Sequence, residues 1–232
     1  MRRVAVLISV SCLSAVIAAA ADDSRLVWAD FELPLDQRPV SAGGGWIQGF
    51  TYQENDTKPA RFTGMPNLDP PAPKVVRTSK DNENRAAAFE YDLQAPNRWS
   101  GAGVEIYGKP EQDGVPVPQD VSGFKTLTLQ VYTAEVVHMR VDFISRQTGR
   151  GETFGKRADE VVSPPQFTWR TRPGFNTYKV PLKDVMQPSW AEPKLDVKKV
   201  LRKLTSLNVS VYCDDCRAEK GVIVVDNLVF EK

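Results

Sequence analysis

The chain has 232 residues, with 30 basic and 29 acidic side chains and a formal net charge of +1. This balance excludes the basic footprint of a nucleic-acid-binding protein, and it gives no reason to expect an anionic membrane surface as a partner. The length suffices for one well-packed domain, and all-β domains of this size often remain undivided.

The N-terminus has the layout of a secretory signal peptide. Two arginines precede the apolar run VAVLISVSCLSAVIAAA, and small residues then lead into Asp22 and Asp23. Cleavage near Ala21 would remove residues 1–21 and leave residues 22–232 as a single domain, secreted or periplasmic. The alternative is that the stretch stays as a membrane anchor. No other apolar stretch is long enough to span a bilayer, so we expect no span in the mature chain.

Period-two alternation of apolar and polar residues predicts strands along most of the chain. The clearest segments are RAAAFEYDL (85–93), GAGVEIYG (101–108), FKTLTLQVYT (124–133), VVHMRVDFIS (136–145), FNTYKVPL (175–182), LTSLNVSVY (204–212) and GVIVVDNLVF (221–230). Segments rich in Pro, Gly and Asp separate them, and only DVKKVLRKL (196–204) has helical character. Many antiparallel strands joined by turns favour an all-β, two-sheet β-sandwich over a closed barrel.

The cysteine pair in YCDDCRAEKG predicts a disulfide between Cys213 and Cys216. With the leader removed, His138 is the only other Cys or His residue, and a structural zinc site needs four such ligands. A thioredoxin-type site needs a helix start after the first cysteine, whereas this pair lies between two strand-like segments. The acids between the cysteines would also raise the thiol pKa values. The pair therefore closes a hairpin loop, and the function lies elsewhere.

Short segments in a fixed order resemble a known family. They are WADFELP (28–34), GGGWIQG (43–49), DVSGFKTLTLQVYT (120–133), FNTYKVPLKDV (175–185) and VVDNLVFEK (224–232). This order resembles the galactose-binding-like jelly-roll β-sandwiches, and especially the calcium-containing carbohydrate-binding modules of glycoside hydrolases. The resemblance implies a jelly-roll fold and an exported, non-catalytic module that binds a polysaccharide or oligosaccharide on one sheet face.

The resemblance also implies a structural calcium where the first and last strands meet. Its ligands would be Glu32 of the FE motif and Asp226 near the final strand, with Asp30 as a third. Calcium prefers six to eight oxygen ligands, which carboxylates and backbone carbonyls supply. The alternative is that Asp226 and Asn227 form a turn at a strand edge and Glu32 is solvated.

Outward positions on the predicted strands provide aromatic rings for the apolar faces of sugars and polar groups for their hydroxyls. The ligand-binding residues expected together on one face are Trp99, Glu105, Tyr107, Gln130, Tyr132, His138, Arg140, Asp142, Asn208 and Tyr212. The alternative is an ordinary solvated face with cross-strand pairs. Trp169 and Trp190 stand in loop-like segments, where a tryptophan either caps a ligand or packs over the end of the core.

Two other classes of function remain open. Acidic residues are plentiful, but nothing in the sequence singles out the carboxylate pair of a glycosidase. A polysaccharide lyase would use residues such as Tyr132, His138 and Arg140, and a serine triad lacks its GxSxG motif. The same fold also occurs in complex I intermediate-associated proteins, so an envelope scaffold with a protein partner is the main alternative to glycan binding.

Overall fold

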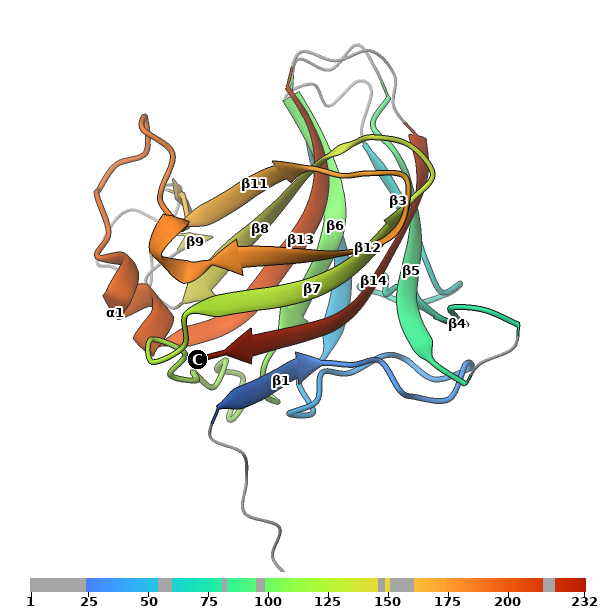
Figure 1. Cartoon of the computed structure of the whole chain (residues 1–232), viewed down its shortest axis with the longest axis horizontal. Coiled ribbons are helices and arrows are strands. Elements are labelled where there is room, and N and C mark those ends of the chain that lie inside the picture. The colour runs from blue at the N-terminus through green and yellow to red at the C-terminus, as the bar shows by residue number, and fades with distance from the viewer. Residues whose placement is uncertain are drawn as a thin grey trace, which may run out of the picture.

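The computed structural model describes residues 24–53, 60–80, 83–94, 99–145, 149–150, 161–214 and 220–232. They form two antiparallel sheets packed face to face, as Figure 1 shows. The predicted signal peptide, residues 1–21, lies outside the described residues, so its cleavage stays a prediction. No helix in the described part of the chain is long and apolar enough to cross a membrane.

The seven-stranded sheet, called the large sheet below, has the strand order β12-β7-β14-β5-β3, and β1 and β4 pair with β14 and β5. Its strands are β1 (Arg25–Ala29), β3 (Arg61–Thr63), β4 (Lys74–Arg77), β5 (Arg85–Asp92), β7 (Thr126–Thr133), β12 (Gly174–Pro181) and β14 (Lys220–Glu231). The β14 strand is central, because it pairs with β5 on one side and β7 on the other.

The five-stranded sheet, called the small sheet below, has the order β11-β8-β13-β6-β2. Its strands are β2 (Ile47–Gln53), β6 (Trp99–Tyr107), β8 (His138–Ser145), β11 (Gln166–Arg170) and β13 (Leu204–Asp214). A short ladder pairs β9 (Gly149–Arg150) with β10 (Val161–Val162). The remaining elements are the 3-10 turn η2 (Leu182–Asp184) and the helix α1 (Val197–Arg202).

The predicted all-β sandwich and its main strands are confirmed, and the helical segment is confirmed with shorter bounds. Asp196 begins α1 as its N-cap and accepts hydrogen bonds from the backbone N–H groups of Lys198 and Lys199. The helix ends before Leu204, which already belongs to β13. The alternation did not single out β1, β2, β3, β4, β9, β10 or β11, because these strands are short or interrupted by glycine.

The core lies between the two sheets and takes every second residue of each long strand. From the large sheet, Leu127, Leu129 and Val131 are buried, and β8 of the small sheet buries Met139, Val141 and Phe143. Side chains at the positions between them therefore lie on the outer faces of the sheets. The candidate functional site is therefore to be sought on an outer face of one of the sheets.

Candidate functional site

The outer face of the small sheet carries polar and aromatic side chains in cross-strand rows. One row joins the register partners Gln48, Glu105, Asn208, Asp142 and Gln166. The next joins Phe50, Gly103, Ser210, Arg140 and Thr168, and a third joins Tyr52, Gly101 and Tyr212. We define the polar face as Gln48, Phe50, Tyr52, Glu105, Tyr107, His138, Arg140, Asp142, Asn208, Ser210 and Tyr212.

Arg140 is the centre of the polar face. Its Nε atom lies 2.9 Å from Oδ1 of Asp142, two residues further along the same strand. Its guanidinium carbon lies 5.0 Å from the ring centre of Tyr52 and 5.8 Å from that of Tyr212. The His138 ring in turn lies 5.7 Å from the Tyr212 ring. Two tyrosine rings of the same outer face, Tyr52 from β2 and Tyr212 from β13, thus lie next to one cation whose counter-ion is buried.

A glycine allows the Tyr52 ring to reach this position. A Cβ atom on Gly101 would stand 2.3 Å from the ring carbon and hydroxyl of Tyr52. Only glycine therefore leaves room for the ring to lie across β6 towards Arg140. Gly101, the first glycine of the GAG segment, is thus required for the position of Tyr52 in the site.

Asp142 is buried, with an exposed fraction of 3%. Burial raises its pKa to about 6, and the charge of Arg140 opposes that rise. Burial likewise raises the pKa of Tyr52 to about 12. At neutral pH the face therefore holds an ionised Asp142 paired with Arg140, next to a tyrosine that keeps its proton.

Glu105 is fixed by its neighbours on the polar face. Its Oε2 atom accepts a hydrogen bond from Gln48 at 2.8 Å, and its Oε1 atom accepts one from the Ser206 hydroxyl at 2.7 Å. Burial, followed by the charge of Glu105 and a hydrogen bond to it, raises the pKa of the Tyr107 hydroxyl. Asn208, between Glu105 and Asp142 in the row, has a buried Oδ1 atom that accepts no hydrogen bond from the described residues. A hydroxyl donor from a ligand would satisfy it.

Most of the predicted ligand-binding residues come together on the polar face: Glu105, Tyr107, His138, Arg140, Asp142, Asn208 and Tyr212. Trp99 begins β6 and pairs with Asp214, but only its backbone is described. The sequence analysis missed Gln48, Phe50, Tyr52 and Ser210. The alternation in WIQGFTYQ could have revealed the first three.

Gln130 and Tyr132 lie elsewhere, so the prediction of a single face is wrong for these two residues. They belong to β7 of the large sheet, where Gln130 pairs with Thr177 and Tyr132 with Phe175. Period-two alternation identifies the outward side of a strand but not the sheet to which the strand belongs. The correction also separates Tyr132 from His138 and Arg140, so the three do not form the grouping expected of a lyase.

The predicted calcium ligands lie around a bulge in β14. The register of β14 against β7 shifts between Asp226 and Val229, and Asn227 has a positive φ of 48°. Asp226 is buried, and its Oδ1 atom accepts a hydrogen bond from the Asn227 backbone N–H at 2.8 Å. Its Oδ2 atom accepts hydrogen bonds from the side-chain amides of Asn84 and Asn227, each at 3.0 Å.

Two further carboxylates lie close enough to act on Asp226. Burial raises the pKa of Asp226 to about 6, and the charges of Glu32 and Asp30 add to the rise. Within the described ranges, no three acidic, His or Cys side chains are arranged to hold a metal ion. A calcium ion at this bulge would therefore need amide or backbone carbonyl oxygens besides carboxylates.

The predicted disulfide falls only partly in the described chain. Cys213 is buried, and its position in β13 pairs with Ser100 of β6. Cys216 lies outside the described residues, so the Cys213–Cys216 disulfide stays a prediction.

No family model matches the chain, and no curated protein matches it. Among solved structures, it is similar to a family 11 carbohydrate-binding module from Clostridium thermocellum in complex with a β-1,3-1,4-mixed-linked tetrasaccharide. The TM-score is 0.53 and the identity 11%, over 89% of this chain and 95% of that one. The family 11 module of the cellulosomal cellulase Lic26A-Cel5E, from the same organism, has a TM-score of 0.51 and 12% identity, over 89% and 94%.

A solution structure of the module CtCBM11 has a TM-score of 0.50 and 12% identity, over 92% of this chain and 98% of that one. At such low identity the likeness shows the fold. The predicted resemblance to the jelly-roll β-sandwich of carbohydrate-binding modules is thus confirmed for the architecture.

Proposed function

We propose that this chain is an exported, non-catalytic module that binds a polysaccharide or oligosaccharide on the polar face. The observation that carries the proposal is the Arg140 centre, where Tyr52 and Tyr212 flank a guanidinium paired with the buried Asp142. Tyrosine rings offer apolar surface to the faces of sugar rings, and the guanidinium and hydroxyls offer hydrogen bonds to sugar hydroxyls.

The shape of the polar face suits a chain-like ligand. The row from Gln48 to Gln166 crosses every strand of the small sheet. With about 4.8 Å between neighbouring strands, the row spans roughly 19 Å. Polar groups along its length provide contacts for several sugar units rather than for one. The family 11 module of similar fold was solved with a β-1,3-1,4-mixed-linked tetrasaccharide. Mixed-linked β-glucan is therefore the first ligand to test.

The state of the carboxylates supports binding without catalysis. A glycosidase needs one carboxyl group that protonates the leaving oxygen and a second that acts as nucleophile or base. On the polar face, Asp142 is buried in its ion pair with Arg140. Both oxygens of Glu105 accept hydrogen bonds from protein side chains. Neither group is presented to a substrate as a free acid or base.

A structural calcium near Asp226 is the second part of the proposal. A buried carboxylate with a raised pKa, facing the like charges of Glu32 and Asp30, is a place where a divalent cation would relieve repulsion. Asn84 and Asn227, whose side-chain amides contact Asp226, would add amide oxygens after rotation of those amides. The ion would hold the β14 bulge and would take no part in glycan binding.

A binding experiment tests the function directly. The mature protein is incubated with insoluble polysaccharides and a glycan array, and its affinity for soluble mixed-linked β-glucan is measured by gel retardation. We expect retention without release of reducing ends or unsaturated products. Product formation would instead establish an enzyme. A folded protein that binds no glycan, but captures an envelope protein in pull-downs, would establish the scaffold alternative.

A further inference from the structure

A loop beside the small sheet presents an exposed tryptophan. Trp190 is 75% exposed and Met186 is 63% exposed, the two largest values among the exposed large hydrophobic residues of the described chain. Both lie in the segment 186–195, between η2 and α1. Single exposed hydrophobic residues are common on protein surfaces. The unusual feature here is how firmly the backbone around Trp190 is held.

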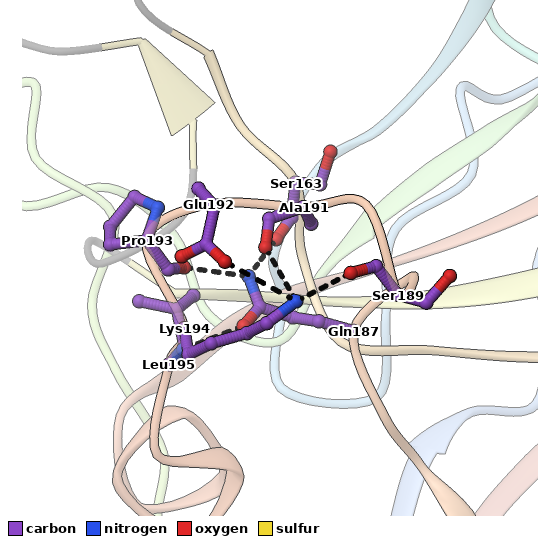
Figure 2. A network of polar contacts seen from close by, with 8 residues as sticks. All are labelled: Ser163, Gln187, Ser189, Ala191, Glu192, Pro193, Lys194 and Leu195. Atoms are coloured by element: carbon purple, nitrogen blue, oxygen red, sulfur yellow. Dashed lines mark hydrogen bonds and ion pairs between the residues drawn. The ribbon is translucent and has the colours of Figure 1, made fainter.

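Lys194 holds the backbone on both sides of Trp190. Its Nζ atom donates hydrogen bonds to the carbonyl oxygens of Ser189 and Ala191, each at 2.8 Å. The Glu192 carboxylate balances its charge at 3.7 Å. Figure 2 shows this ammonium group inside the curve of the loop, with the carbonyls of both residues directed at it. The Ala191 side chain is buried, which anchors the loop immediately after Trp190.

Gln187 ties the two ends of the loop to each other and to the sandwich. Its Nε2 atom donates to the carbonyl oxygens of Ser163 at 2.7 Å and Pro193 at 3.3 Å. Its Oε1 atom accepts from the Leu195 backbone N–H at 2.6 Å, as seen in Figure 2. The loop is thus closed by side-chain to backbone hydrogen bonds, and the backbone that carries Trp190 is held in place before any partner arrives.

The loop adjoins the end of the polar face. Gln166, the last member of the long row on the small sheet, exchanges backbone hydrogen bonds with Met186 at 2.9 and 3.1 Å. The segment that carries Trp190 thus continues from the edge of that sheet, next to β11. A glycan chain that follows the row outwards across β11 meets this loop next.

We propose that Trp190 is a second contact for the glycan, a fixed platform on which one sugar ring stacks after the chain leaves the small sheet. The inference rests on the proposed function. An indole offers a large apolar ring face and an N–H donor, which suits the apolar face and hydroxyl rim of a pyranose. Because the loop is ordered in advance, little conformational entropy is lost on contact. The platform contributes only to chains long enough to reach beyond the strands.

Ligands of two lengths distinguish binding at Trp190 from binding at the polar face. Affinities for soluble mixed-linked β-glucan and for its tetrasaccharide are measured by calorimetry on the wild-type protein and Trp190→Ala. We expect about tenfold weaker binding of the polymer, or about 1.4 kcal/mol, and unchanged binding of the tetrasaccharide. The hydrogen bonds around residue 190 use backbone groups of its neighbours, so the variant should unfold at the wild-type temperature.

Two further variants test the role of the rigid loop. Lys194→Met keeps the indole but removes its clamp, so it should weaken binding of the polymer by less than Trp190→Ala does. Phe175→Ala removes an exposed aromatic ring from the large sheet, away from the polar face and the loop. It is the matched control and should bind both ligands as the wild type does. The fluorescence of Trp190 is the part of the emission that is lost in Trp190→Phe. The polymer should protect this emission from quenching by acrylamide, and the tetrasaccharide should not.

The outcomes separate the two proposals. Wild-type binding of both ligands with no effect of Trp190→Ala would overturn the platform and leave the function standing. Equal losses for polymer and tetrasaccharide would also overturn it, because they would place Trp190 within the primary site. If the wild-type protein binds neither probe nor any polysaccharide in the panel, both proposals fail. Dissociation of a dimer by Trp190→Ala would show that a second copy of the chain occupies the loop instead.

Discussion

Replacing Asp142 by asparagine should stabilise the protein at neutral pH. The ordinary pKa of an aspartate side chain is 3.8, and burial raises the pKa of Asp142 to about 6 even with Arg140 beside it. At 1.36 kcal/mol for each pKa unit, the folded protein disfavours the ionised side chain by about 3 kcal/mol. The attraction to Arg140 is already contained in that pKa. A neutral side chain of the same shape removes the penalty, because asparagine resembles the protonated carboxyl group that the folded state favours.

The pH dependence gives the sign of the effect. Between pH 4 and pH 6 the folded state keeps a proton on Asp142 that the unfolded state has lost, so wild-type stability falls as the pH rises through this window. The variant lacks this titration. We therefore expect equal stabilities near pH 4 and an advantage for Asp142→Asn that grows to about 3 kcal/mol at pH 7.

Urea unfolding followed by tryptophan fluorescence, at half-unit steps from pH 4 to pH 8, measures both curves. Asp226 titrates in the same range, but it is present in both proteins and cancels in their difference. Asp120→Asn serves as a control whose effect on stability has the opposite sign. Hydrogen bonds from Ser122 lower the pKa of this exposed carboxyl, so the ionised side chain stabilises the fold and its replacement should destabilise it. A variant at position 142 that is less stable than the wild type at pH 7 would refute the reasoning, since the ion pair would then outweigh burial.

The remaining predictions concern binding, metal and disulfide. Tyr212→Ala should weaken glycan binding at least tenfold, because it removes an aromatic ring beside Arg140. Tyr132→Ala, on the large sheet, is the control and should bind as the wild type does. Gel retardation in mixed-linked β-glucan measures both variants, and equal losses of affinity would contradict the proposed site. Chelation should lower the melting temperature of the wild type but not of Asp226→Asn, as calorimetry would show; an unchanged wild-type value would exclude a structural calcium. Thiol titration of the unfolded, non-reduced mature protein should find no free thiols, and titration of two would refute the Cys213–Cys216 disulfide.

Much of the sandwich follows from alternation in the sequence. In β7 and β8 every second residue is apolar, and these residues form the core, while the residues between them lie on outer faces. The same rule places Arg140 and Asp142 on one side of β8, next to each other. Local periodicity was therefore enough to predict that Arg140 and Asp142 are neighbours on one face, but it did not identify them as its centre.

The division between two sheets did not follow from periodicity. The strands β7 and β8 are consecutive in the chain, yet β7 belongs to the large sheet and β8 to the small one. Tyr132 and His138 consequently lie on opposite outer faces of the sandwich, although both are outward positions of neighbouring strands. Sheet membership is set by pairings between residues far apart in sequence, such as those of β13 with both β6 and β8.

The sequence pattern also did not reveal how deeply each outward side chain is buried. Asp142 and Arg140 look alike in the alternation, but the aspartate is buried and the arginine remains partly exposed between two rings. Tyr52 escaped notice because its strand is interrupted by Gly49, where a Cβ atom would stand 2.3 Å from the Phe62 ring. Such contacts depend on how strands from distant segments pack, which one strand's pattern does not contain.

The pairing of β1 with β14 has a mechanical consequence. These strands run antiparallel, Arg25 stands opposite Glu231, and the backbone N–H of Lys232 donates to the carbonyl oxygen of Ser24 at 3.0 Å. The two ends of the sandwich therefore lie side by side, as Figure 1 shows for β1 and the C-terminus. A force that pulls these ends apart acts across the ladder, and it loads the hydrogen bonds between β1 and β14 one after another rather than all at once. Under tension the domain should begin to unfold where its two ends meet. The β1 strand should separate from β14 first, while the small sheet keeps its pairing.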